Sequence, residues 1–266
     1  GTRVALCVSY YGGEFCGWQA QPHLPVATVQ KTLEQALSKV AATPISTHCA
    51  GRTDTGVHGV AQVVHFDDPV GRSQKAWVMG CNSNLPSTVR VLWAKSVPSD
   101  FHARFSAVSR HYRYVISNSA IQSPHHAGLV SHCRKPLDAQ AMHDASQALL
   151  GEHDFSAFRA AQCQATHPIR EILGVRVKRV ENFVILDIEA NAFLYHMVRN
   201  LVGSLQMVGL GLRSREWIAE LLSGKDRTLG GDTAGPSGLY LQSITYPERF
   251  GLPVHQALNS LLLGGG

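Results

Sequence analysis

The order of strand-like and helix-like segments in the first hundred residues limits the folds open to this chain. Residues 28–41 carry apolar side chains at intervals of three and four, which is the period of a helix with one buried face. Runs of β-branched and apolar residues predict strands before and after it. The predicted elements follow the order β-α-β-β-α-β, over residues 4–10, 28–41, 45–50, 60–66, 73–81 and 89–97. This is the order of a ferredoxin-like unit, whose sheet is mainly antiparallel and whose helices share one face.

The second half of the chain has a similar order of elements without repeating the sequence. Its predicted strands and helices cover residues 110–116, 138–150, 171–179, 183–190, 195–210, 215–222 and 239–245. Asp138 is a suitable N-cap for the first of these helices. The fold class that we predict is α+β, with two ferredoxin-like or RRM-like α/β domains that have mainly antiparallel sheets and flank a basic central cleft. We place the N-terminal domain at residues 1–104 and the C-terminal domain at residues 105–266.

The composition indicates a globular protein with a basic surface. Hydrophobic residues make up 44% of the 266 residues, which is enough for a packed core. The sequence contains no run of about 18 apolar residues, the length that would predict a membrane-spanning helix. The first residues lack the basic and apolar regions of a signal peptide, so we expect a cytoplasmic protein. The 24 basic side chains outnumber the 19 acidic ones and give a net charge of +5, which favours a polyanionic partner.

The cysteines and histidines do not form a metal-binding motif. The cysteines stand at least nine residues apart, at positions 7, 16, 49, 81, 133 and 163. This spacing excludes a local Cys-x-x-Cys pair, and the 14 histidines follow no standard zinc spacing. We therefore predict reduced thiols and no metal site.

Asp54 lies in a glycine-flanked turn between two predicted strands. The turn reads Gly-Arg-Thr-Asp-Thr-Gly-Val-His over residues 51–58. An aspartate beside a glycine often does no more than bond its own backbone, and this would then be an ordinary turn. The alternative is a carboxylate held in place for chemistry, between Arg52 and His58.

The longer string favours chemistry, because it resembles the active-site signature of the TruA family of tRNA pseudouridine synthases. In that family the aspartate is the essential catalytic residue. Other segments resemble further signatures of the same family in the same order, namely residues 10–21, 28–30, 101–107, 110–114, 191–200 and 238–241. By this resemblance, which spans nearly the whole chain, the sequence is identified as a member of the TruA family.

The resemblance implies an isomerase that converts uridine to pseudouridine at positions 38–40 of the anticodon stem-loop of tRNA, without a cofactor. It also implies a homodimer that binds tRNA, with no other protein partner and no membrane. The catalytic residues that it implies are Asp54 and Arg199. The substrate-binding residues that it implies are Tyr112, Arg52, His58 and Leu239.

The reaction breaks the bond between uracil N1 and the ribose, turns the base and joins its C5 to the ribose, with no redox change. Three uses of Asp54 fit this chemistry and stay open: attack on C1′, addition to C6, or removal of the 2′ proton. A carboxylate in a dry pocket stays ionised only if a cation compensates for the lost water, and the resemblance gives this role to Arg199. It assigns Tyr112 to stacking on the uracil, Leu239 to closing the pocket and Arg52 to the RNA near the extracted base.

Two other function classes remain open at this point. A nucleoside N-glycosidase would need two cooperating carboxylates and would release free uracil. A noncatalytic RNA-binding module would need aromatic and basic residues but no aspartate in a glycine-flanked turn. Phe15, Trp18 and Gln19 suit either core packing or RNA contact. The loops at 119–133 and 229–237 are either plain surface or the border of an RNA groove.

Overall fold

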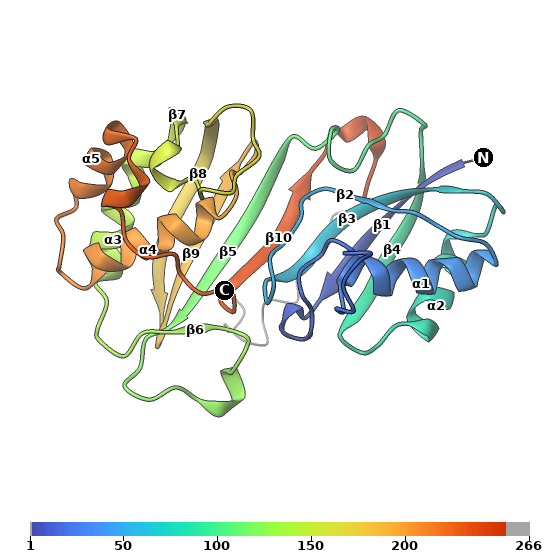
Figure 1. Ribbon diagram of the computed structural model, residues 1–266, viewed down its shortest axis with the longest axis horizontal. Helices are drawn as coiled ribbons and strands as arrows, with labels where there is room; N and C mark the ends of the chain where they lie inside the picture. The colour runs from blue at the N-terminus through green and yellow to red at the C-terminus, as the bar shows by residue number, and fades with distance from the viewer. Residues whose placement is uncertain (1, 254–266) are drawn as a thin grey trace. The chain divides into compact units, whose positions relative to one another are not determined.

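A computed structural model describes residues 2–253 of the chain, and these residues form two compact units. The N-terminal unit contains residues 2–108 and 240–253, and the C-terminal unit contains residues 109–239 (Figure 1). The predicted C-terminal domain, residues 105–266, included residues 240–253. These residues instead belong to the N-terminal unit, where Tyr240 and Leu241 pair with a strand of that unit. The end of that predicted domain, residues 254–266, lies outside the described residues.

Each unit combines a sheet with helices, so the predicted α+β class is confirmed. None of the helices within residues 2–253 has the length and apolar content needed to cross a membrane. In the same part of the chain, no three His, Cys, Asp or Glu side chains are grouped so that they would hold a metal ion.

The sheet of the N-terminal unit is mainly antiparallel. The elements of this unit are β1 (Thr2–Tyr10), α1 (Val29–Ala41), β2 (His48–Cys49), β3 (His58–Asp68), α2 (Gln74–Asn84), β4 (Val89–Val97) and β10 (Leu239–Thr245), whose first residue, Leu239, belongs to the C-terminal unit. β1 pairs antiparallel with β3 and with β4, and β2 pairs antiparallel with β3. β10 pairs parallel with β3, where Tyr240 lies opposite His58. β3 therefore has paired neighbours on both sides at the end where it begins.

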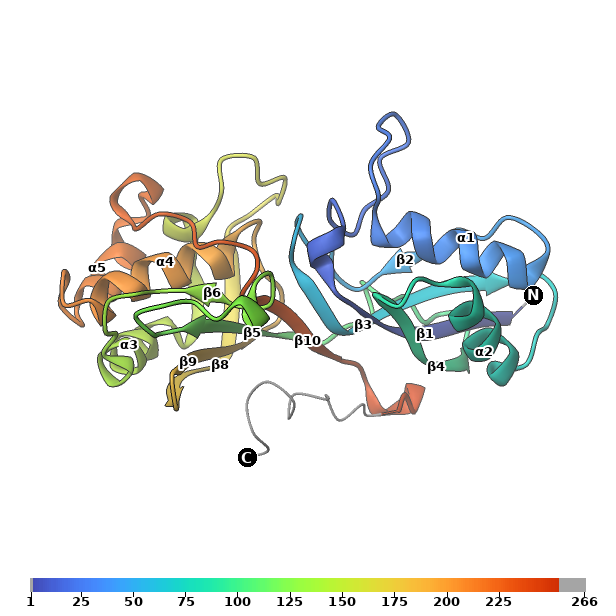
Figure 2. The ribbon, with the colours of Figure 1, turned by 90° about the horizontal axis from the view of Figure 1, so that it is seen from below.

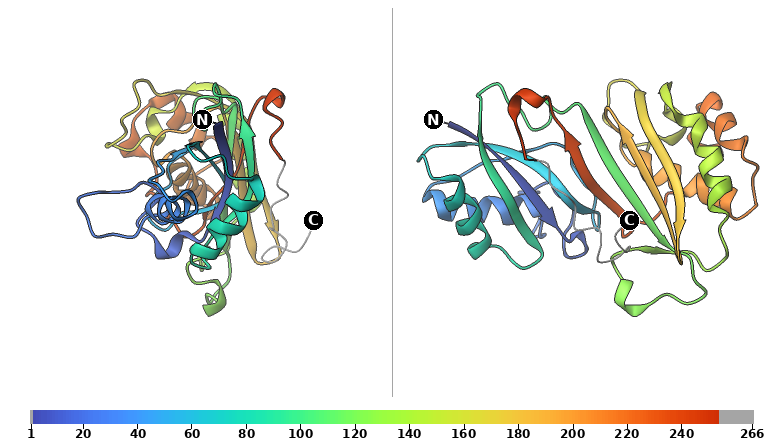
Figure 3. Two further views of the ribbon diagram at one scale, coloured as in Figure 1. Left: turned by 90° about the vertical axis from the view of Figure 1, so that its right-hand side faces the viewer. Right: turned by 180° about the vertical axis from the view of Figure 1, so that it is seen from behind.

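The alternating side chains of β1 contribute to two cores, one on each face of this sheet. Leu6 packs in one cluster with Leu33 of α1 and Trp77 of α2, so both helices lie on the same face (Figure 2). Ala5 points to the opposite face and packs in a second cluster with Phe101. Figure 3 (right) shows the strands from behind, opposite to the view of Figure 1. The second face is covered by the chain that follows β4 and by the chain that follows β10.

The C-terminal unit combines mainly antiparallel strands with three helices. Its elements are β5 (Ser109–Ser117), β6 (Ser131–His132), α3 (Ala139–Ser146), β7 (Gly151–Asp154), β8 (Ile169–Val180), β9 (Phe183–Ala190), α4 (Met197–Gly209) and α5 (Trp217–Gly224). The strands β5, β9, β8 and β7 pair antiparallel in that order, and the short β6 pairs parallel with β5. Asp138 caps α3 as predicted, because its carboxylate accepts the N–H of Ala141 at 2.9 Å.

Several elements depart from their predicted bounds, and two of these departures have a clear local reason. The strand predicted over 45–50 shortens to β2, because Thr47 donates its N–H and its hydroxyl to the Glu34 carboxylate, at 2.7 and 3.0 Å, and not to a neighbouring strand. The helix predicted over 195–210 begins later, because His196 has a φ of 60°, in the left-handed region that a right-handed helix excludes. The short strands β6 and β7 were not predicted.

His65 of β3 is a buried histidine on the second face of the N-terminal sheet. His65 is 2% exposed, and its Nδ1 accepts the N–H of Ala103 at 2.9 Å. Burial is the main reason that the pKa of His65 falls from 6.5 to about 3. The charges that lower this pKa further are those of Arg3, His102 and His48, and Asp67 opposes them.

We predict that His65 makes folding sensitive to acid. Because its folded pKa lies below its unfolded value, its contribution to stability is complete above pH 6.5 and is lost as the pH falls towards 3. His65→Asn keeps an acceptor for Ala103 and removes the titration. The free energy of unfolding, measured with urea at several pH values between about 7 and 5, should then depend less on pH, by up to about 1.4 kcal/mol per pH unit. Equal slopes for the two proteins would contradict this assignment.

Candidate active site

The Asp54 loop, residues 50–57, is a tight turn that connects β2 to β3. The N–H of Val57 donates to the Asp54 carbonyl at 3.0 Å and closes the turn. Gly56 has a φ of 83°, a conformation that glycine adopts without steric cost. Thr53 is buried, whereas Asp54 is half-buried. The loop therefore keeps Thr53 inside the unit and leaves Asp54 partly accessible.

Two hydrogen bonds fix Thr53, the residue before Asp54. The hydroxyl of Tyr10 lies 2.8 Å from Thr53 Oγ1, with both groups buried. The N–H of Trp18 donates to the Thr53 carbonyl at 3.0 Å. Both partners belong to the end of β1 and the segment after it. Thr53 is thus held through its side chain and its backbone at once, which limits the positions open to Asp54.

Two glycines let the segment after β1 approach the Asp54 loop more closely than a side chain would permit. A Cβ on Gly12 would lie 1.9 Å from the Val57 carbonyl oxygen. A Cβ on Gly17 would lie 2.9 Å from the Thr53 carbonyl oxygen, and Gly17 also has a φ of 80°. Both contacts are with backbone, which cannot swing aside as a long side chain can. The two backbones therefore pack directly on each other.

His58 supports the loop and has no surface to offer a substrate. The residue is 1% exposed, and its Nδ1 accepts the N–H of Gly12 at 2.9 Å. Its ring stacks between Tyr11 and Tyr240, with ring centroids 5.2 and 4.6 Å away. Burial raises the pKa of the Tyr240 phenol, which keeps that ring neutral. The prediction that His58 binds substrate is therefore replaced by a positioning role, because burial removes the ring from the surface.

The other residues of this early segment divide between core and surface. Phe15 and Trp18 are 7% and 1% exposed and pack in the core under α1, whereas Gln19 is exposed. Core packing is thus the role of the two aromatic residues. Sequence reasoning missed the contacts of residues 10–18 with the Asp54 loop. The available signal was the pair of glycines in an aromatic-rich segment that belongs to no predicted strand or helix.

Arg199 of α4 is held in a fixed orientation by its own unit. Its Nε donates to the Ala234 carbonyl at 2.8 Å, and the N–H of Ala234 donates to the Arg199 carbonyl at 3.0 Å. Its Nη1 lies 3.3 Å from Nε2 of His196, the residue in the left-handed conformation at the start of α4. Ala234 belongs to the loop at 229–237. That loop therefore positions a half-buried guanidinium, a role that its sequence did not reveal.

Tyr112 and Tyr114 lie on β5 with different exposures. Tyr112 is half-buried and meets the ring of Phe193 edge to face, with centroids 4.9 Å apart. Tyr114 is 1% exposed and donates its hydroxyl to the Gly235 carbonyl at 2.8 Å. Only Tyr112 of this pair keeps ring surface that a base can contact.

The last two predicted site residues differ sharply in exposure. Arg52 is exposed and lies in the Asp54 loop, two residues before the carboxylate. Leu239 is 5% exposed and follows Gly238, whose carbonyl accepts the N–H of Val115 at 2.9 Å. Arg52 thus shares a loop with Asp54, whereas Tyr112 and Leu239 belong to the C-terminal unit, as Arg199 does.

We predict that Gly12→Ala disturbs the Asp54 loop more than other glycine substitutions do. The new methyl group would overlap the Val57 carbonyl, and overpacking of this kind costs about 1–3 kcal/mol. The free energy of unfolding should fall by that amount, and amide exchange should become faster at residues 53–57. Gly174→Ala is the control, because a Cβ there has no neighbour within 4 Å. Similar behaviour of the two variants would show that the close approach does not constrain the loop.

Comparison with known proteins identifies the family. A family model described as tRNA pseudouridine synthase matches residues 6–106 and 145–247. The chain is 53% identical over 251 residues to tRNA pseudouridine synthase A of Idiomarina loihiensis, covering 94% of this chain and 95% of that one. It is 51% identical over 251 residues to the enzyme of the same name from Escherichia fergusonii, with 94% and 92% covered.

A solved Cbf5-Nop10-Gar1 complex contains a chain with 12% identity and a TM-score of 0.37, matched over 90% of this chain and 48% of that one. The family model covers most of the sequence and includes the Asp54 loop, and the identity to the curated relatives extends over nearly their whole length. This chain therefore belongs to the tRNA pseudouridine synthase family.

Proposed function

We propose that this protein converts uridine to pseudouridine at positions 38–40 of the anticodon stem-loop of tRNA. The observation that carries the proposal is the near full-length identity of 53% to enzymes named tRNA pseudouridine synthase A. The construction of the Asp54 loop supports it, since two glycines and a buried tyrosine hold a single carboxylate in place. The positions within the anticodon stem-loop rest on the resemblance to the TruA family.

In the proposed reaction Asp54 supplies the one carboxylate that the chemistry needs. The N1–C1′ bond breaks, the uracil turns while bound, and C5 forms the new bond to C1′. C5 loses a proton and N1 gains one, so the product is an isomer of the substrate. Attack on C1′, addition to C6 and removal of the 2′ proton all require this carboxylate at a fixed distance from one nucleotide. The hydrogen bonds to Thr53 support such a fixed position.

The other site residues receive roles by resemblance. Arg199 is proposed to compensate the charge of Asp54, and the bond from its Nε to Ala234 supports a fixed guanidinium. Tyr112 is proposed to stack on the target uracil, which its exposed ring surface permits. Arg52 is proposed to contact the RNA beside the extracted base, in keeping with its exposure. Leu239 is proposed to close the pocket with apolar surface.

We also infer the finer architecture and setting of the protein. We propose two ferredoxin-like domains. For the first of them, the N-terminal unit, the support is the strand order β4-β1-β3 with β2 paired to β3. A basic RNA-binding cleft is supported by the net charge of +5. A homodimer and a cytoplasmic location follow from the resemblance to the TruA family.

The direct test is incubation with unmodified tRNA that carries tritium at uridine C5. Release of tritium to water together with pseudouridine in the digested tRNA is the expected result. Free uracil in place of pseudouridine would identify a nucleoside N-glycosidase. Binding of tRNA with unchanged uridine would identify a noncatalytic RNA-binding module.

We predict that Asp54→Asn keeps the fold and most of the tRNA affinity but forms no detectable pseudouridine, because the amide has nearly the size of the carboxylate without its charge. Asp100→Asn is the control, since Asp100 is an exposed aspartate of the same unit that pairs with Arg249. Single-turnover rates measure the effect. A rate for Asp54→Asn within tenfold of the wild-type rate would exclude the assignment, because a tenfold change corresponds to only about 1.4 kcal/mol in the activation free energy.

We predict that Arg199 and Arg52 differ in the step they affect. Arg199→Ala should lower the single-turnover rate at saturating enzyme by roughly 100-fold, the usual cost of losing one preorganised electrostatic contact. Arg52→Ala should instead weaken productive tRNA binding and reduce the salt dependence of the affinity by about one phosphate contact. Arg215→Ala, at an exposed arginine paired with Asp144, should change neither quantity. A lower rate in Arg52→Ala together with weaker tRNA binding in Arg199→Ala would mean that the two roles are exchanged.

A further inference from the structure

Phe105 presents a large aromatic ring to solvent on the N-terminal unit. It is 75% exposed, compared with 43% for Tyr195, the other aromatic residue among the large exposed side chains of residues 2–253. A single exposed apolar side chain is common and needs no explanation by itself. Phe105 differs from such residues because the turn that carries it is rigid and because its neighbours are rings and cations.

Local hydrogen bonds make the turn at residues 101–106 rigid. The N–H of His102 donates to Ser106 Oγ, and the N–H of Ser106 donates to the His102 carbonyl, both at 2.9 Å. The N–H groups of Arg104 and Phe105 both donate to Nδ1 of His102, at 3.1 and 3.2 Å. The backbone on both sides of the exposed ring is therefore fixed.

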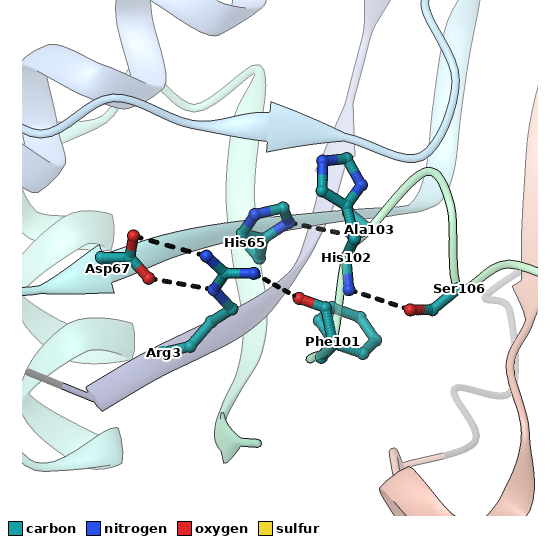
Figure 4. A network of polar contacts seen from close by, with 7 residues as sticks. All are labelled: Arg3, His65, Asp67, Phe101, His102, Ala103 and Ser106. Atoms are coloured by element: carbon teal, nitrogen blue, oxygen red, sulfur yellow. Dashed lines mark hydrogen bonds and ion pairs between the residues drawn. The ribbon is translucent and has the colours of Figure 1, made fainter. Parts of the chain in front are cut away.

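The turn is also anchored to the sheet (Figure 4). Arg3 of β1 donates to the Phe101 carbonyl at 2.7 Å and pairs with Asp67 of β3 at 2.9 Å. The N–H of Ala103 donates to the buried His65 of β3. Phe101 itself is fully buried in the second core. An exposed ring on so rigid a support loses little conformational entropy when a ligand packs on it.

The neighbours of Phe105 suit a nucleotide. The ring of His102 stacks on Phe105, with centroids 4.3 Å apart and planes inclined by 30°. The guanidinium of the exposed Arg104 lies 5.4 Å from the Phe105 centroid. Burial and the charges of His48, Arg3 and Arg104 lower the pKa of His102, which keeps its ring neutral at pH 7. We call His102, Arg104 and Phe105 the Phe105 platform.

The Phe105 platform lies beside the strand that leads into the Asp54 loop. The ring of His48 in β2 is 5.5 Å from the ring of His102. Burial raises the pKa of the neighbouring Cys49 thiol to about 12, and the charges of Arg52 and Arg104 both oppose this rise. One arginine belongs to the Asp54 loop and the other to the platform.

We propose that Phe105 stacks on a base of the tRNA substrate, at an unpaired nucleotide or a helix end, while Arg104 binds an adjacent phosphate. The proposal rests on the proposed function, since it takes tRNA as the ligand. Aromatic rings bind exposed bases of any sequence through their faces, and arginine adds charge and planarity. The nearby carboxylate of Asp67 is paired with Arg3, so the platform presents net positive charge to its ligand. That charge favours RNA over a second copy of this basic chain.

The test compares Phe105→Ala, Phe105→Trp, Arg104→Ala and Met79→Ala. Met79 is the matched control, because it is a 59% exposed apolar side chain on α2, on the other face of the same sheet. The probe is an unmodified tRNA transcript, and the readouts are its Kd across salt concentrations and the single-turnover rate of pseudouridine formation. Phe105→Ala should raise the Kd at least about fivefold, the lower end of the effect of one stacked base, whereas Phe105→Trp and Met79→Ala should not.

The salt dependence separates the two contacts of the platform. Arg104→Ala should reduce the slope of log affinity against log salt by about one, whereas Phe105→Ala should leave that slope unchanged. An unchanged Kd in Phe105→Ala, or an equal rise in Phe105→Trp, would overturn the proposal. A shift in oligomeric state in sedimentation without a change in Kd would assign the ring to a protein interface instead. Failure of the unmodified enzyme to form pseudouridine would count against the proposed function and leave the binding test valid.

Discussion

The backbone contact between Gly12 and Val57 is the constraint on which the Asp54 loop depends. No side chain fits between the two chains, since a Cβ on Gly12 would lie 1.9 Å from the Val57 carbonyl oxygen. The same Gly12 donates its N–H to His58, whose ring lies against Tyr240 of β10. A loop that would otherwise be mobile is therefore joined to β1, β3 and β10 through buried groups. Folding alone therefore limits the positions open to Asp54.

This arrangement suits the catalytic role that we propose for Asp54. A group that must act at one atom of a nucleotide is useful only when its position is held within a fraction of an ångström. The bonds to Thr53 from Tyr10 and Trp18 supply that restraint from the interior, and Asp54 itself stays half-buried. The free energy of folding, rather than that of substrate binding, then holds Asp54 in position.

The sequence predicted the elements whose periodicity is strong and missed the contacts that join them. The helix at 28–41 and the strands at 89–97 and 239–245 appear within a residue of their predicted bounds, because one packed face determines each of them. The pairing of β10 with β3 links residues nearly two hundred positions apart, and no local pattern encodes it. His58 illustrates the same limit at the site. Its neighbours in the motif pointed to substrate, whereas its burial comes from Tyr11 and Tyr240, which lie elsewhere in the sequence.

The register of β1 on β3 sets both the Asp54 loop and the Phe105 platform. Arg3 lies opposite Asp67 near one end of the pair, and Tyr10 lies opposite Gly59 near the other. Because side chains alternate along a strand, Arg3 reaches the face that carries the 101–106 turn, whereas Tyr10 reaches Thr53. A slip by one residue would reverse both faces at once. The buried residues between these ends therefore keep the carboxylate proposed for catalysis and the proposed RNA contact in one fixed relation within the N-terminal unit.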